Sequence, residues 1–146
     1  MDERVARLKT PAECDSFIRN VQAAHPNLAL EARLRAVQLR AAGHGAETQA
    51  ELEALEAVYA YEAALSRRNG KKTRASRTWE MIKRRGIIQA VDAIVQRPTE
   101  TVGYTTLLEM GLKDFAFENV VLRHPGLFST EAVDRSQRRV KEELDA

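Results

Sequence analysis

Apolar side chains recur at helical spacing along most of this chain, and no other feature constrains its fold as much. Leu52, Leu55 and Val58 illustrate the pattern, because residues three and four apart lie on one side of a helix. Glycine and proline divide the pattern into segments. No run supports a strand by alternating apolar and polar residues, and the best strand candidate, Ile87-Ile88, lies within a helical pattern. The sequence predicts an all-α fold, a compact orthogonal bundle of about six to seven helices.

Capping residues set the expected helix boundaries. Thr10-Pro11 suits a helix start, since threonine caps and proline fits the first helical position. Ser76 is expected to cap a helix that continues through Gly86, a weak point in its middle. Residues 1–9 are expected to form a loose end. The predicted helices start near Thr10, Asn27, Ala46, Ser76, Thr99 or Thr101, Leu112 and Ser129, and end near His25, Ala42, Arg68, Pro98, Gly111, His124 and Leu144.

A length of 146 residues is ordinary for one domain, and we expect residues 1–146 to form a single domain. Cys14 is the only cysteine, so the chain has no internal disulfide and no CxxC metal or redox pair. A lone cysteine fits a reducing setting. The first residues lack the apolar core of a signal peptide, and no stretch approaches the roughly 18 apolar residues of a membrane span. We therefore expect a cytoplasmic protein without a membrane partner.

A basic segment, residues 67–85, is the feature most informative about function. It holds nine cations and one carboxylate, that of Glu80, for a local net charge of +8. The whole chain carries +2, so the remainder is net negative by six. Positive potential is therefore concentrated in one part of the chain. The nine cations are Arg67, Arg68, Lys71, Lys72, Arg74, Arg77, Lys83, Arg84 and Arg85.

Nucleic-acid binding is the first interpretation of this segment. Phosphates attract such a patch without sequence preference, and the binding depends steeply on salt because counterions are released. Ser76, Thr73, Thr78 and Asn69 are expected to donate hydrogen bonds to phosphate oxygens. Free N–H groups where the Ser76 helix begins add an anion site, and Arg77 is placed to contact a base. The expected binding residues are the nine cations and Ser76, with DNA favoured over RNA.

A role in protein binding is the second interpretation, ranked close behind the first. Cations at positions 67 and 68 suit the negative end of a helix dipole, and those at 83–85 suit a solvated helix face. Residues 46–66 hold five glutamates and no cation, so the basic segment has an acidic surface to meet, in its own chain or in another copy. This pattern indicates a helical interaction or homo-oligomerising module with an acidic partner.

Known nucleic-acid-binding motifs do not decide between these two interpretations. Zinc-finger spacing, an RNA-recognition motif and a basic zipper are all missing from the sequence. A helix-turn-helix around residues 76–96 stays open, although the sharp turn is not convincing. Trp79 shares an apolar side with Ile82, so we expect it at the edge of the core rather than as a stacking platform.

An enzyme is the third and weakest interpretation. Asp114 and Glu118 lie four apart on one predicted helix and share a face, which suits metal binding or acid–base catalysis. The ordinary alternative is a polar stripe of a mostly buried helix, bonded to Arg123 or to a loop arginine. His25, His44 and His124 show no metal-ligand spacing, and no phosphate-binding loop or nucleophile motif is present. We therefore expect no catalytic residue, no metal and no cofactor.

Overall fold

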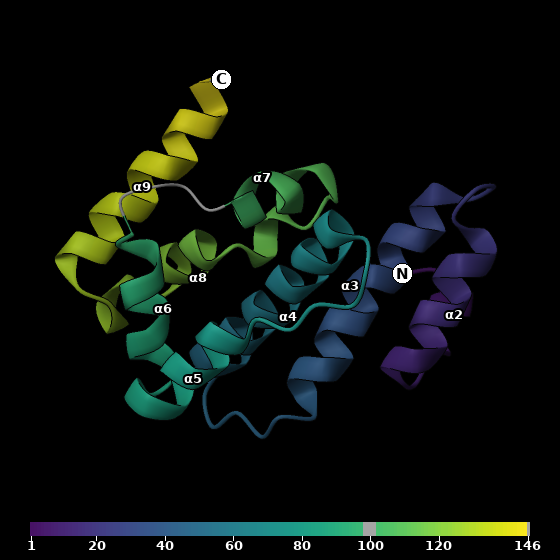
Figure 1. Ribbon diagram of the computed structural model, residues 1–146, viewed down its shortest axis with the longest axis horizontal. Helices are drawn as coiled ribbons and strands as arrows, with labels where there is room; N and C mark the ends of the chain where they lie inside the picture. Colours follow the sequence, from purple (N-terminus) through teal and green to yellow (C-terminus); the bar gives the residue numbers. More distant parts are fainter. Residues whose placement is uncertain (98–101, 146) are drawn as a thin grey trace. The chain divides into compact units, whose positions relative to one another are not determined.

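The structure is a computed structural model that describes residues 1–97 and 102–145 (Figure 1). Within these ranges it contains α-helices and short 3-10 turns and no β-strand, which confirms the all-α prediction. The chain divides into two compact units, Met1–Ala46 and Glu47–Ala146. The expected single domain, helix number and orthogonal packing stay predictions. The candidate caps Thr99 and Thr101 lie outside the described residues. No helix of the described ranges is long and apolar enough to span a bilayer.

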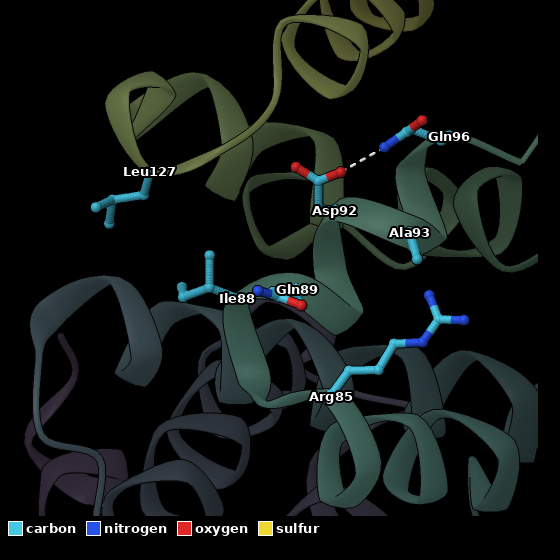
Figure 2. A pocket seen from close by; sticks show the side chains of 7 residues that line it. All are labelled: Arg85, Ile88, Gln89, Asp92, Ala93, Gln96 and Leu127. Carbon is cyan, nitrogen blue, oxygen red and sulfur yellow. Dashed lines mark hydrogen bonds between the residues drawn. The ribbon is translucent and has the colours of Figure 1, made fainter.

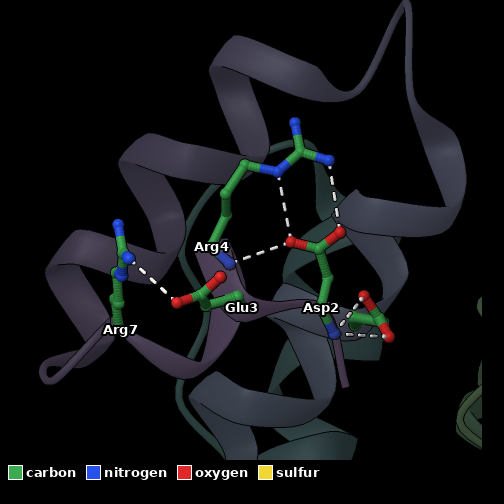
Figure 3. Close-up of polar contacts among 5 residues, drawn as sticks. Asp2, Glu3, Arg4 and Arg7 are labelled. Atoms are coloured by element: carbon green, nitrogen blue, oxygen red, sulfur yellow. Dashed lines mark hydrogen bonds and ion pairs between the residues drawn. The ribbon is translucent and has the colours of Figure 1, made fainter.

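The amino-terminal unit consists of α1 (Glu3–Ala6), α2 (Pro11–Val21) and α3 (Pro26–Ala42). Thr10 caps α2 as predicted, since its side chain accepts from the N–H of Glu13. The loose end expected at residues 1–9 is wrong, because Asp2 caps α1 and pairs with Arg4 (Figure 3). Val5 on α1 is fully buried against the small core of this unit, so apolar contact holds the short helix in place.

The carboxyl-terminal unit is built from the remaining elements. Its core gathers Val58, Val91, Val95, Val120 and Val121, all fully buried. Ser129 caps the last helix as predicted, because its hydroxyl accepts a hydrogen bond from the N–H of Ala132 (3.1 Å). The elements are α4 (Gln49–Asn69), α5 (Ser76–Arg85), α6 (Ile87–Val95), α7 (Val102–Glu109), η1 (Lys113–Phe115), α8 (Phe117–Arg123), η2 (Pro125–Leu127) and α9 (Thr130–Asp145).

Gly86 separates α5 from α6, whereas the sequence predicts one helix through this position. Its φ of 90° and ψ of 161° define a conformation that is essentially restricted to glycine. Its N–H donates to the carbonyl of Ile82 (2.8 Å) at the end of α5, and its carbonyl accepts from Ala90 (3.0 Å) at the start of α6. The expected weak point is therefore a complete corner between two helices.

The single helix predicted over residues 112–124 is also wrong, because the chain is extended at Ala116. The carbonyl of Lys113 accepts from Asn119 Nδ2 (2.6 Å), and that of Asp114 accepts from Arg123 Nη1 (3.0 Å). In a continuous helix these carbonyls would bond to backbone N–H groups four residues on. Side chains of α8 replace those bonds, so η1 and α8 meet at a break.

Candidate nucleic-acid interface

The basic segment begins where α4 ends and then runs back along the same helix. Gly70 follows α4 with a φ of 69°, the left-handed conformation that commonly ends helices. The helix end predicted near Arg68 is therefore confirmed. Residues 71–75 then lie along the last turns of α4 before α5 begins (Figure 1). The end of α4, this loop and α5 thus carry the cations along one path over the carboxyl-terminal unit.

Hydrogen bonds between neutral groups hold this loop on α4. Ser66 Oγ accepts from the backbone N–H of Thr73 (2.8 Å) and donates to the Thr73 carbonyl (3.3 Å). Asn69 Nδ2 donates to Thr73 Oγ1 (3.2 Å), and this hydroxyl donates to the carbonyl of Lys71 (3.0 Å). Asn69 and Thr73, expected on phosphate, are therefore engaged with the loop itself. No cationic side chain takes part in any of these bonds.

Glu62 of α4 fixes the start of α5. Its Oε2 accepts from the backbone N–H of Ala75 (2.9 Å) and from the indole Nε1 of Trp79 (2.7 Å). The Trp79 ring lies against that of Tyr59, with centres 5.2 Å apart, and packs on the main core. The guanidinium carbon of Arg74 lies 5.9 Å from the centre of the indole ring. Trp79 therefore occupies the edge of the core, as the apolar pattern predicts.

All nine cations of the basic segment have exposed side chains, and so does Ser76. Within the described ranges none of these cations belongs to an ion pair. Like charges gathered in this way create a positive potential that attracts anions. The geometry thus leaves the whole charge of the segment open to solvent and to a partner.

Two of the expected hydrogen-bond donors are placed differently from the prediction. Ser76 is the first residue of α5 rather than its cap, because the carbonyl of Ala75 already accepts from the N–H of Trp79 (3.0 Å). Its hydroxyl is therefore exposed and makes no capping bond. Thr78 is buried, with 5% of its surface exposed, so it does not reach a phosphate. Thr78 faces the core because it lies on the inner side of an amphipathic helix.

The glutamates of α4 do not neutralise the basic segment. Glu53 accepts from Arg123 Nε (2.5 Å) and lies 3.1 Å from Nε2 of His124, both outside that segment. Glu51 interacts with Thr48, the cap of α4. Glu62, as described, binds only neutral donors of the loop and α5. Folding of the basic segment onto this helix therefore occurs without the internal ion pairs that the second interpretation allows.

Two carboxyl groups on α4 have shifted pKa values. Burial acts to raise the pKa of Glu53, but hydrogen bonds from Arg123, Gln49 and His124 together lower it below its ordinary value. Burial and the nearby charge of Glu53 raise the pKa of Glu56. Neither group contacts the basic segment, so these shifts describe the packing of α4 on α8.

The structure does not bring Asp114 and Glu118 together on one helix face. Asp114 lies in η1 and is exposed, whereas Glu118 lies in α8 beyond the break and is 6% exposed. Glu118 Oε2 accepts from Arg139 Nη1 of α9 (2.8 Å). The prediction that these two carboxylates share one helix face is therefore wrong. The arginine partner expected by the ordinary alternative is present, although it is Arg139 rather than Arg123.

Other candidate chemical groups lie apart from one another. Among the residues the structure describes, no three His, Cys, Asp or Glu side chains are placed to hold a metal ion. His25 and His44 are exposed on the amino-terminal unit, and His124 lies beside Glu53. Cys14 is fully buried, and burial raises the pKa of its thiol, which makes the thiolate scarcer.

The α5–α6 pair differs from a helix-turn-helix in where its cations lie. In that motif the second helix enters the major groove. Here α6 carries no lysine or arginine and buries Ala90, Val91, Ile94 and Val95 in the core. The cations lie instead on α5 and in the loop before it. The arrangement therefore favours contacts to phosphates over insertion of a basic second helix.

Two residues that position the segment are not marked by any motif in the sequence. Glu62 and Ser66 lie four apart on α4, so they share the side of the helix on which the loop lies. Their polarity beside small and apolar neighbours was the available signal. Their partners are seven to 17 residues further along the chain, a separation that helical periodicity does not reveal.

Comparison of the chain with models of protein families, with curated proteins and with solved structures finds no match. What the chain does has to follow from the chemistry of its own residues.

Proposed function

We propose that this chain binds nucleic acid, DNA ahead of RNA, through phosphate contacts made by the basic segment. The observation that carries the proposal is the exposure of nine cations that have no ion-pair partner within the described ranges. Each phosphate neutralised by lysine or arginine releases counterions, which supplies affinity without sequence preference. The contacting residues are Arg67, Arg68, Lys71, Lys72, Arg74, Ser76, Arg77, Lys83, Arg84 and Arg85.

The way the segment is held supports this role. The loop is fixed by neutral hydrogen bonds, so the cations are gathered on a defined backbone without being paired. The backbone N–H groups of Ser76 and Arg77 in the first turn of α5 have no partner among the described residues, and such groups favour anions. Trp79 is engaged with Glu62 and the core, so the segment lacks the exposed aromatic platform on which recognition of single-stranded RNA often relies.

The dimensions of the segment suit a duplex. Helix α5 has ten residues and is about 15 Å long at 1.5 Å per residue. Residues 71–75, if fully extended, add at most about 18 Å. Together they reach about 33 Å at most, close to one turn of B-DNA at roughly 34 Å. A segment of this length can meet several phosphates along one side of a duplex.

A cytoplasmic location belongs to the same proposal. The lone thiol, that of Cys14, is buried and unpaired by any other cysteine, which suits a reducing compartment. A cytoplasmic protein of this kind would meet DNA and RNA directly.

A charge-matched pair of variants tests the function. One variant changes Lys71, Lys72, Arg74 and Arg77 to alanine. The control changes the same number of exposed cations elsewhere, namely Lys9, Arg19, Arg138 and Lys141. Both variants carry a net charge of −2, because four cations are removed from a chain of net charge +2.

Binding to a labelled duplex at low salt is then measured by fluorescence anisotropy. The proposal predicts that the loop variant loses most of its affinity and that the control keeps affinity close to that of the wild type. Equal losses in the two variants would mean that only the total charge matters. If the wild type does not bind at low salt, the proposed function is wrong, and an acidic protein surface becomes the partner to test.

A further inference from the structure

A hollow lies at the corner between α5 and α6, beside the last cation of the basic segment. Its volume is about 380 Å³, near the lower end of the range for small-ligand sites. Arg85, Ile88, Gln89 and Gln96 line it, together with Leu127 of η2 (Figure 2). Arg85 belongs to both the hollow and the basic segment, so a strand bound along the segment reaches the hollow.

Two polar side chains of the hollow offer free hydrogen-bonding groups. Arg85 and Gln89 are exposed, and neither has a hydrogen-bond or ion-pair partner in the part of the chain that the structure describes. The amide of Gln89 presents a donor and an acceptor side by side. Asp92 is engaged differently, since it accepts from the N–H of Ser129 (2.7 Å), from its hydroxyl (3.0 Å) and from the amide of Gln96.

The hollow also has an apolar side. Leu127 is 56% exposed, and the only other large apolar side chain so exposed within the described ranges is Met1. Ile88 is half-buried. Figure 2 shows the Gln89 amide between the Ile88 side of the hollow and the guanidinium of Arg85. An apolar side, an amide and a cation therefore follow one another across the hollow.

These three kinds of group suit the three parts of one nucleotide. A base has an apolar face and an edge with donors beside acceptors, and a phosphate adjoins it through the sugar. We propose, on the basis of the function proposed above, that the hollow takes one unpaired nucleobase of a bound nucleic acid, at a bulge or a strand end. The base lies on Leu127 and Ile88, its edge pairs with Gln89, and Arg85 contacts the adjoining phosphate.

The amide suits all four bases, because each base has an edge on which a donor lies next to an acceptor. Gln89 therefore distinguishes an unpaired base from no base, rather than one base from another. The rest of the basic segment binds nucleic acid through phosphate contacts alone. The chain is thus expected to prefer nucleic acid that offers an unpaired base beside a duplex.

The test compares two duplexes of identical sequence and phosphate number. One has a single unpaired adenosine in the middle of one strand, and the other has an abasic sugar at the same place. Anisotropy titrations use the wild type, Gln89→Ala, Leu127→Ala and the control Gln38→Ala, which removes an exposed helical glutamine from the amino-terminal unit. Circular dichroism verifies that each variant is folded.

The wild type and Gln38→Ala are expected to bind the adenosine bulge about fivefold or more tightly than the abasic bulge, the lower part of the range for a bidentate contact to a base. Gln89→Ala and Leu127→Ala are expected to bind both duplexes alike, with affinity for the abasic duplex unchanged. Equal affinities of the wild type for the two duplexes would overturn the base site and leave phosphate binding intact. No binding to either duplex at low salt would overturn the proposed function as well.

Discussion

Replacing Glu62 with alanine removes the one acceptor that fastens both the end of the loop and the start of α5 to α4. The carboxylate accepts from the N–H of Ala75 and from the indole of Trp79, at 2.9 and 2.7 Å. Ala75 is 5% exposed, so its N–H has little access to water once the acceptor is gone. The variant therefore leaves a buried donor without a partner and frees the indole.

The expected loss of stability in Glu62→Ala follows from these two hydrogen bonds. A hydrogen bond to a charged group contributes about 1.5–3 kcal/mol, so losing both costs about 3–6 kcal/mol of unfolding free energy. Glu62→Gln keeps an acceptor oxygen but loses the charge, so we expect it to cost about half as much. Either loss is large beside a typical stability of about 5–15 kcal/mol.

Trp79 is the only tryptophan, so its fluorescence reports directly on the site. Urea unfolding followed by this fluorescence measures the free energies of the wild type, Glu62→Ala and Glu62→Gln. The control is Glu80→Ala, which removes an exposed glutamate that makes no hydrogen bond or ion pair within the described ranges and is expected to change stability by less than about 0.5 kcal/mol. If Glu62→Ala is as stable as this control, the carboxylate does not hold the segment and the reasoning fails.

Three further variants test the rest of the fold by urea unfolding. Glu118→Ala leaves Arg139 buried without its counter-ion and should cost about 3–5 kcal/mol, and a cost near zero would contradict the buried pair. Burial acts to raise the pKa of Glu53, but its hydrogen-bond donors outweigh this effect and hold the pKa below its ordinary value. The stabilisation from Glu53 is therefore complete above the ordinary pKa of a glutamate and is lost as the pH falls through the lowered pKa. Glu53→Gln should therefore be less stable than the wild type at neutral pH, with a difference that shrinks in acid, and a difference constant with pH would refute this. Gly86→Ala should cost about 1–3 kcal/mol through backbone strain alone, whereas Gly126→Ala, with an equally open site and no positive φ, should cost little.

Local chemistry made several features predictable from the sequence. Thr10 and Ser129 cap helices through bonds to residues three positions on, and Gly70 ends α4 with its own backbone conformation. Each of these signals lies within a few residues of the structure it determines. The exposure of the cations was predictable as well, since lysine and arginine are almost never fully buried unless they are paired.

Features that depend on distant partners were not predictable. Ala116 interrupts a helical pattern because side chains of the next helix take the carbonyl bonds of η1. Gly86 fits both a continuous helix and a corner, and the packing of α6 in the core accompanies the corner. In the sequence Glu62 is one of several acidic residues. Its role follows only from the fold, which places the loop and the indole of Trp79 against its carboxylate. The hollow beside Leu127 likewise joins α6 to a turn more than 30 positions later.

The salt dependence of duplex binding tests the central claim most directly. Titrations at about 50 to 200 mM salt give the slope of log affinity against log salt, which is about −0.9 for each phosphate neutralised. When Lys71, Lys72, Arg74 and Arg77 become alanine, we predict that the steep wild-type slope becomes shallower by about 0.9 for each phosphate that is no longer neutralised. The control lacking Lys9, Arg19, Arg138 and Lys141 should retain the wild-type slope. A wild-type slope near zero, or an equal change in both variants, would contradict phosphate binding by the basic segment.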